Sequence, residues 1–137
     1  MSKLTEEECQ EEITKVHAKV KELTGYEMYL FRLPYGDYDN HVIKAASACG
    51  YLTIQWDVDS LDWKDYGTDA IIKTVTQNKS LGNGSIILCH NGAKYTVKAL
   101  DTMLYTLKDM GYEIVPVSEL VLKENYHLNN EGRQIAN

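Results

Sequence analysis

The sequence predicts an α/β fold built around parallel strands. Short apolar runs alternate with amphipathic helical stretches, which is the pattern of βα units. Polar clusters follow three of the apolar runs, and enzymes of this class place their sites at the carboxyl ends of such strands. The chain has 137 residues, fewer than the roughly 200 of a complete (β/α) barrel. We therefore expect an incomplete barrel or a smaller fold.

A helix is expected first, between Thr5 and Gly25. Thr5 followed by Glu8 is a capping-box signature at its start, and glycine is common just past a helix end. Apolar residues recur between them at helical spacing, at Cys9, Ile13, Val16, Val20 and Leu23. A short buried strand is expected at residues 29–32, and Pro34 ends it.

The alternation continues along the rest of the chain. The expected order is a helix from Asp39 to about Cys49, a strand at residues 51–58, a helix from Thr68 or Asp69 to Lys79, a strand at residues 85–89, a helix from about Tyr95 to Met110, a strand at residues 112–115 and a last helical turn within residues 117–122. Residues 125–137 lack apolar periodicity, so we expect a flexible polar tail there. Four parallel strands cannot close a barrel, so we also expect open sheet edges through which the chain forms a homo-oligomer.

The charge balance restricts the possible partners. A net charge of −6 argues against a nucleic-acid partner, because proteins of that class usually carry a clustered basic surface. A glycan is a compatible ligand. The chain has no run of about 18 apolar residues and no basic-then-apolar signal, so we expect no membrane segment and a cytoplasmic location for the chain as given.

Polar residues end three of the expected strands. They read R-x-P-Y-G at residues 32–36, D-S-x-D-W at residues 59–63 and L-x-H at residues 88–90. In this order the clusters resemble the last three motifs of the polysaccharide deacetylases, carbohydrate esterase family 4, whose domain is also called the NodB-homology domain. The second cluster is similar to that of bacterial peptidoglycan N-deacetylases. The resemblance implies that residues 1–124 are the C-terminal part of a distorted (β/α) barrel.

Two further motifs of that family do not occur in the chain. A T-F-D-D-G motif supplies the family's catalytic base and a metal-binding aspartate, and an H-[ST]-x-x-H motif supplies two metal-binding histidines. We therefore expect a portion of a larger enzyme that binds no metal and is inactive alone. The complete parent is expected to use a divalent metal, zinc or cobalt, and to be secreted or associated with the cell envelope.

Structural roles are also open to the residues of the three clusters. Arg32 ends an apolar strand and must reach a carboxylate or water, because an unpaired buried charge is costly. Pro34 and Gly36 are typical of a turn that ends a strand. A histidine at a strand end, such as His90, is often a hydrogen-bonded structural residue, and Asp59 suits a helix cap.

The resemblance implies a catalytic or binding role for most of them. Arg32 would hydrogen-bond the catalytic aspartate of the missing segment, and the backbone N–H of Tyr35 would bind the oxyanion. His90 would be the general acid that protonates the leaving amine, and Asp59 would hold its second ring nitrogen. Substrate contacts would come from Pro34, Trp63 and Leu88, of which the last also suits core packing. Caps or surface positions suit the other carboxylates of this region, Asp57, Asp62 and Asp65.

The implied reaction of the parent is hydrolysis of N-acetyl groups on the amino sugars of peptidoglycan or chitin-type glycans. A metal-activated water would be the nucleophile. Two other classes of protein stay open. One is a glycan-binding pseudoenzyme that has lost hydrolysis, and the other is a non-catalytic interaction fragment.

Overall fold

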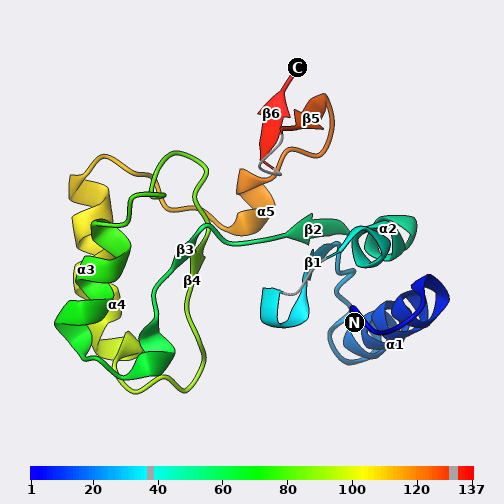
Figure 1. Ribbon diagram of the computed structural model, residues 1–137, viewed down its shortest axis with the longest axis horizontal. Helices are drawn as coiled ribbons and strands as arrows, with labels where there is room; N and C mark the ends of the chain where they lie inside the picture. Colours follow the sequence, from blue (N-terminus) through cyan, green and yellow to red (C-terminus); the bar gives the residue numbers. More distant parts are fainter. Residues whose placement is uncertain (37–38, 130–132) are drawn as a thin grey trace. The chain divides into compact units, whose positions relative to one another are not determined.

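The computed structural model describes residues 1–36, 39–129 and 133–137, which form two compact units, Met1–Gln55 and Trp56–Asn137 (Figure 1). In each unit a helix packs against a pair of parallel strands. The predicted α/β class with parallel strands is therefore confirmed. Within the described ranges, no helix is long and apolar enough to cross a membrane.

The first helix, α1 (Glu6–Thr24), begins and ends as the sequence predicts. The backbone N–H of Glu8 donates to the hydroxyl of Thr5 at 3.2 Å, and the backbone N–H of Thr5 donates to the carboxylate of Glu8 at 2.8 Å. These two bonds form the predicted capping box. At the other end Gly25 has a φ of 73°, which a residue without a β-carbon adopts without strain.

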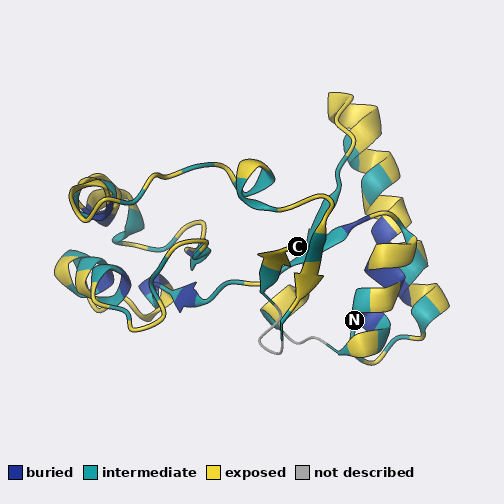
Figure 2. Ribbon diagram, turned by 90° about the horizontal axis from the view of Figure 1, so that it is seen from above, coloured by how far each residue is buried: buried dark blue, intermediate teal, exposed yellow. Residues whose placement is uncertain are grey.

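The rest of the first unit is a strand–helix–strand segment. Strand β1 (Leu30–Arg32) is followed by α2 (Asn40–Ala48) and by β2 (Leu52–Ile54), which pairs parallel to β1. Asp39 caps α2 as predicted, by accepting two backbone N–H groups. Helices α1 and α2 pack together, and Figure 2 colours the buried positions dark blue. The core of this unit contains Cys9, Ile13, Leu33, Val42, Ala45, Ala46 and Tyr51.

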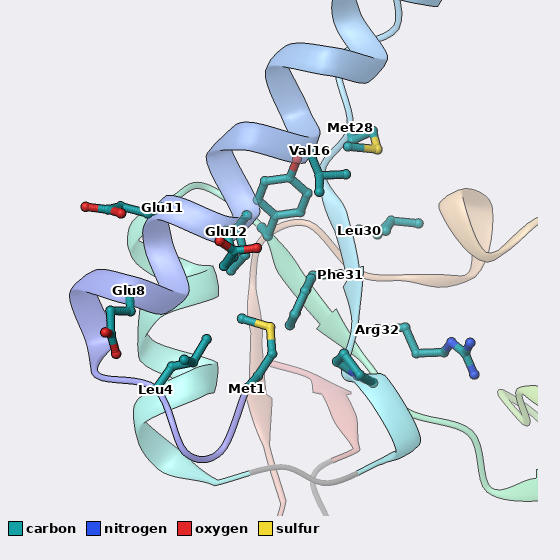
Figure 3. Close-up of a pocket in the computed structure, with 13 residues that line it drawn as sticks. Met1, Leu4, Glu8, Glu11, Glu12, Val16, Met28, Leu30, Phe31 and Arg32 are labelled. Carbon is teal, nitrogen blue, oxygen red and sulfur yellow. The ribbon is translucent and has the colours of Figure 1, made fainter.

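An apolar groove of about 650 Å³ lies between α1 and β1 (Figure 3). Apolar side chains from both elements and from the segments beside them line it, at Met1, Leu4, Ile13, Val16, Met28, Leu30, Phe31 and Tyr51. Its α1 side carries the glutamates Glu8, Glu11 and Glu12. Arg32 and Pro34 of the first polar cluster also line it, so this cluster borders an apolar surface.

The second unit repeats the strand–helix order. Strand β3 (Val58–Asp59) leads to α3 (Thr68–Thr76), and β4 (Ile87–Leu88) leads to α4 (Thr96–Asp109). β3 and β4 pair in parallel, and α3 packs against both α4 and β3. The core between them contains Val58, Ile71, Val75, Ala99, Met103 and Leu107. Both polar clusters of this unit follow its strands, as predicted.

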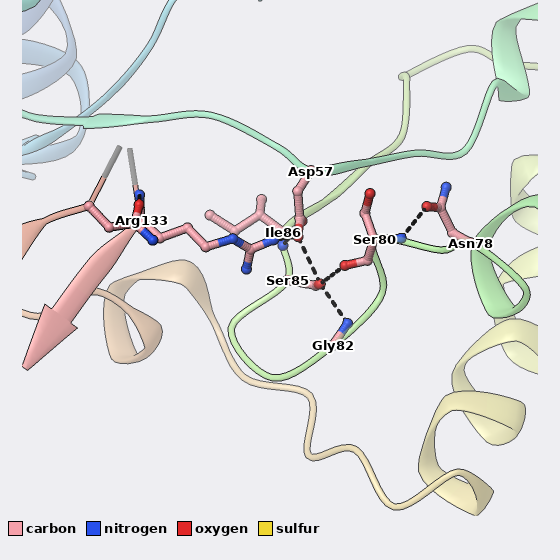
Figure 4. A network of polar contacts seen from close by, with 8 residues as sticks. Asp57, Asn78, Ser80, Gly82, Ser85, Ile86 and Arg133 are labelled. Atoms are coloured by element: carbon pink, nitrogen blue, oxygen red, sulfur yellow. Dashed lines mark hydrogen bonds and ion pairs between the residues drawn. The ribbon is translucent and has the colours of Figure 1, made fainter. Parts of the chain in front are cut away.

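The single strand predicted at residues 51–58 is wrong, because the run forms two strands, β2 and β3, that pair with different partners. The polar residue Asp57 explains the division (Figure 4). Its carboxylate accepts the backbone N–H of Ile86 at 2.8 Å and the hydroxyl of Ser85 at 2.9 Å. Arg133 adds an ion pair at 2.8 Å. These bonds turn the chain toward the segment before β4 and so begin the second strand pair.

The strand predicted at residues 112–115 is also wrong, since the described structure assigns no strand there. The backbone N–H of Tyr112 donates to the carbonyl of Leu107 at 3.1 Å, and the Tyr112 side chain packs on the core of the second unit. The stretch therefore closes the end of α4 instead of pairing in a sheet. The predicted last helical turn is present as α5 (Val117–Leu120).

A hairpin lies where the sequence predicts a flexible polar tail at residues 125–137. Strands β5 (Tyr126–Leu128) and β6 (Gln134–Ala136) pair antiparallel, and residues 130–132 lie outside the described residues. The side-chain amide of the first β6 residue bonds both the backbone N–H and the carbonyl of Leu122, each at 2.8 Å. Polar side chains hold this segment, which explains why apolar periodicity does not reveal it.

Candidate functional site

The loop after β3 is shaped by its first aspartate. Oδ1 of Asp59 accepts the backbone N–H of Leu61 at 2.9 Å, which closes an Asx turn. Leu61 then has a φ of 53°, a left-handed conformation that costs a non-glycine residue roughly 1–2 kcal/mol. A short helical turn, η2 (Asp62–Lys64), follows directly. Asp59 is thus engaged within its own loop, and the chain turns so that Asp62 lies inside the unit.

Asp62 is the carboxylate at the centre of the site. Its side chain is fully buried, whereas the side chain of His90 is 40% exposed. Oδ1 of Asp62 lies 2.7 Å from Nδ1 of His90. Oδ2 accepts the backbone N–H of His90 at 2.8 Å and the hydroxyl of Thr96 at 2.7 Å. The carboxylate therefore joins the loop after β3, the end of β4 and the start of α4, and it holds the imidazole in one orientation.

The hydrogen bonds decide the charge state of Asp62. Burial by itself raises the pKa of this carboxyl group, because it disfavours the charged form. The backbone N–H of His90, the hydroxyl of Thr96 and the His90 ring lower the pKa, and together they outweigh burial. The pKa of Asp62 is therefore below its ordinary value, and the group is an anion at neutral pH.

The predicted contact between Asp59 and His90 is wrong, because Asp62 makes it. The sequence predicts a contact with His90 for Asp59 and a cap or surface position for Asp62. In the structure the two aspartates have the opposite roles. The first caps its own loop, and the second reaches a residue 28 positions away. The local sequence carries no signal that tells which of the two aspartates closes the Asx turn and which reaches the histidine.

A hollow of about 270 Å³ lies beside His90. Its lining consists of Trp63, Asp65, His90, Asn91, Gly92, Ala93 and Lys94. Because Nδ1 of His90 is engaged by Asp62, the ring offers Nε2 to a ligand, and no hydrogen bond within the described residues uses that atom. Trp63 is 56% exposed and gives the hollow an aromatic surface, and its contact with a substrate stays a prediction. The hollow thus combines a proton donor or acceptor with an aromatic surface.

Leu88 occupies a different environment from Trp63. It is buried, pairs with Asp59 between β4 and β3, and is absent from the lining of the hollow. In this structure Leu88 contributes to packing, which is the alternative that the sequence also allowed.

The first polar cluster belongs to the other unit. The side chain of Tyr35 is fully exposed, and its backbone has φ 59° and ψ 6°. The backbone N–H of Tyr35 donates no hydrogen bond to any described residue, as a ligand-binding amide requires. The guanidinium of Arg32 points away from the glutamates of α1 (Figure 3). Pro34 is exposed at the rim of the apolar groove.

Backbone strain gathers at the motif loops. The described residues include four non-glycine positions with positive φ, and three of them lie in the first two clusters or within two residues of them: Tyr35, Leu61 and Asp65. Such conformations cost free energy and persist where the surrounding structure enforces them, commonly at functional sites. The strain therefore supports a functional role for each loop within its own unit.

Comparisons with known proteins agree with this geometry. The polysaccharide deacetylase family matches residues 1–54. The peptidoglycan-N-acetylglucosamine deacetylase PgdA of Listeria monocytogenes is 36% identical over 120 residues, which are 88% of this chain and 25% of that protein. A family 4 carbohydrate esterase pseudoenzyme from Bacillus anthracis superposes with a TM-score of 0.80 at 30% identity, over 86% of this chain and 41% of that one. A family 4 carbohydrate esterase from Streptomyces lividans gives a TM-score of 0.75 at 28% identity, over 99% and 64%.

The chain belongs to the polysaccharide deacetylase family, carbohydrate esterase family 4. Within that family its curated relatives include bacterial peptidoglycan N-deacetylases. The chain spans between a quarter and a half of the length of these relatives, 25% of the Listeria protein and 48% of a Bacillus subtilis one.

Deacetylases of this family are generally metal-dependent. In residues 1–36, 39–129 and 133–137 no group of three or more His, Cys, Asp or Glu side chains is placed to hold a metal ion. The carboxylate at the centre of the site, Asp62, already accepts three hydrogen bonds. The described residues therefore do not fit the family's metal site.

Proposed function

We propose that this chain is the acid-bearing portion of a peptidoglycan N-deacetylase, an enzyme that hydrolyses N-acetyl groups on amino sugars. The observation that carries the proposal is the contact of His90 with the buried anion of Asp62, at the edge of a hollow walled by Trp63. The similarity to peptidoglycan deacetylases over most of the chain supports the same class of substrate.

In this proposal His90 acts as the general acid. Hydrolysis adds water to the acetyl carbon and breaks its bond to the sugar nitrogen, so that acetate and a free amine form. The amine leaves readily only when it gains a proton, and His90 donates that proton from Nε2 while Asp62 stabilises the imidazolium. Trp63 packs against the acetyl group or the sugar ring. Asp62 is a positioning residue, because it acts through His90.

The first cluster contributes two further groups. The free backbone N–H of Tyr35 binds the oxyanion that develops on the acetyl oxygen, and Arg32 holds the base that activates water. The base itself and any metal come from outside the described residues. We accordingly propose that the chain alone is inactive and that its parent acts at the cell envelope.

A chimera tests this function. The chain replaces the matching part of the Listeria deacetylase, and acetate release from peptidoglycan is measured. We expect activity in the chimera, and a loss of at least about a hundredfold in kcat for its His90→Ala variant, because general acid catalysis contributes 10²–10⁴-fold. His127→Ala is the matched control, since His127 lies on the exposed β5 strand. A folded chimera without activity, or an active one that tolerates His90→Ala, would contradict the proposal.

A second candidate is a glycan-binding pseudoenzyme. It is supported by the likeness to the Bacillus anthracis pseudoenzyme and by the lack of a metal-binding group among the described residues. The pure chain, incubated with chitotetraose and zinc or cobalt, should then bind the oligomer without releasing acetate. The chimera separates the two candidates, because only the enzyme portion restores turnover.

We also propose that the chain self-associates. Each parallel pair has only two strands, and such a sheet is marginally stable with both outer edges unpaired within the described residues. A second copy can supply the missing strand. Light scattering at micromolar concentration should give at least twice the mass of 15.6 kDa. A monomer that unfolds cooperatively would rule out this association.

A further inference from the structure

The dipeptide Asn-Gly occurs twice in the chain, at Asn83-Gly84 and at Asn91-Gly92. Asparagine is a chemically labile residue, and a following glycine makes it more so, because glycine carries no β-carbon to shield its backbone nitrogen. All four residues are exposed, and the two glycines have similar φ angles, 82° and 76°. The two pairs are therefore alike in sequence, in exposure and in the conformation of their glycines.

The first pair lies in a turn that hydrogen bonds close. The backbone N–H of Ser85 donates to the carbonyl of Gly82 at 3.1 Å, and the backbone N–H of Gly82 donates to the hydroxyl of Ser85 at 2.9 Å (Figure 4). The same hydroxyl donates to the carboxylate of Asp57 at 2.9 Å. Because the residues on both sides of Asn83-Gly84 are held, the backbone between them cannot rotate freely while these bonds last.

The second pair is not held in this way. Among the described residues, no hydrogen bond of ordinary geometry joins His90 to Ala93, and none involves Asn91 or Gly92. Both residues of the pair line the hollow beside His90. The side-chain amide of Asn91 and the backbone nitrogen of Gly92 can therefore approach each other without breaking a bond of the fold.

We propose that Asn91 is a site of spontaneous deamidation, which the structure selects over Asn83. The backbone nitrogen of Gly92 attacks the side-chain amide carbon of Asn91 and loses its proton, and ammonia leaves as the C–N bond of that amide breaks. Water opens the resulting five-membered succinimide at one of its two carbonyls, which gives aspartate or isoaspartate. Water is the only co-reactant of the net reaction.

The reaction changes the hollow at His90. Among the described residues Asp65 supplies the one carboxylate that lines the hollow, and either product adds a second at position 91. Isoaspartate also adds one carbon atom to the main chain between His90 and Thr96, the two residues that bond to the carboxylate of Asp62. The inference does not depend on the proposed function, because the reaction needs only the chain and water.

The experiment follows deamidation of the full chain at mildly alkaline pH, both folded in buffer and unfolded in guanidinium chloride. Samples taken over several days are digested, and mass spectrometry of the peptides gives the deamidated fraction at each asparagine. Ion-exchange chromatography of the intact chain follows the added negative charge independently.

In the folded chain we expect Asn91 to deamidate at least about fivefold faster than Asn83, because the need to open a turn against one ordinary hydrogen bond lowers the reactive population by about that factor. In the unfolded chain, where the turn is lost, the two rates should agree within about twofold. Asn91→Gln should remove the fast reaction, since attack on glutamine closes a six-membered ring and is far slower.

Asn83→Gln is the matched control, and it should leave the rate at Asn91 unchanged. Equal rates at the two asparagines of the folded chain would overturn the inference. So would an Asn91 that reacts in the unfolded chain and not in the folded one, or a fast gain of negative charge that persists in Asn91→Gln.

Discussion

The two units of the chain carry their parts of the site in different ways. In Trp56–Asn137 the functional residues hold one another, because the buried carboxylate of Asp62 bonds His90 twice and Thr96 once. In Met1–Gln55 Tyr35 of the first cluster stands fully exposed in a left-handed conformation, next to residues that line an apolar groove. The second unit thus organises its polar groups around a buried carboxylate, whereas the first presents an exposed backbone turn.

The largest effect is expected from a substitution of Asp62, whose hydrogen bonds hold the site in the second unit together. Asp62→Ala removes the acceptor for three donors, and leaving buried donors unsatisfied is expensive. We expect the free energy of unfolding to fall by about 3 kcal/mol, measured by urea denaturation. Asp59→Ala, which removes one part-buried acceptor of a local turn, should cost only about 1 kcal/mol. Equal losses for the two variants would show that the second unit does not depend on this network.

Acid sensitivity sharpens the same comparison. The pKa of Asp62 is lowered in the folded protein, so the unfolded chain takes up the proton first as the pH falls. The contribution of Asp62 to stability is therefore complete above the unfolded pKa of about 3.9 and is lost as the pH falls below it, toward the folded pKa.

Urea unfolding at several pH values measures this loss. The difference in unfolding free energy between the original chain and Asp62→Asn should be largest above pH ~5 and should shrink by pH ~3. A difference in unfolding free energy that does not change with pH would mean that protonation of Asp62 does not weaken its hydrogen bonds.

The smallest effect concerns the first unit. Tyr35→Gly removes a side chain that is fully exposed and relieves a left-handed conformation. The strain relieved, roughly 1–2 kcal/mol, exceeds the extra flexibility of glycine in the unfolded chain, so we expect a gain of about 0.5–1 kcal/mol. Tyr35→Phe should be neutral. Destabilisation by glycine would reveal a contact of the tyrosine ring that the exposed position does not suggest.

Local signals in the sequence were sufficient to predict most helices and strands and to place the motifs at the ends of strands. The capping box at Thr5, the Asp39 cap and the glycine after α1 depend on neighbours within a few residues, and all were predicted correctly. The polar clusters at the ends of β3 and β4 followed from the same short-range pattern. The membership of the chain in its family followed from three short motifs in order.

The features that the sequence did not predict depend on contacts between residues that are distant in the sequence. Asp62 and His90 lie 28 positions apart in the sequence, and the ion pair between Asp57 and Arg133 joins residues 76 positions apart. No periodicity marks such pairs, because a carboxylate that caps its own loop and one that reaches across the fold look alike in sequence. The structure separates them through the Asx turn at Asp59, which occupies one aspartate locally and leaves the other, buried, to position the histidine.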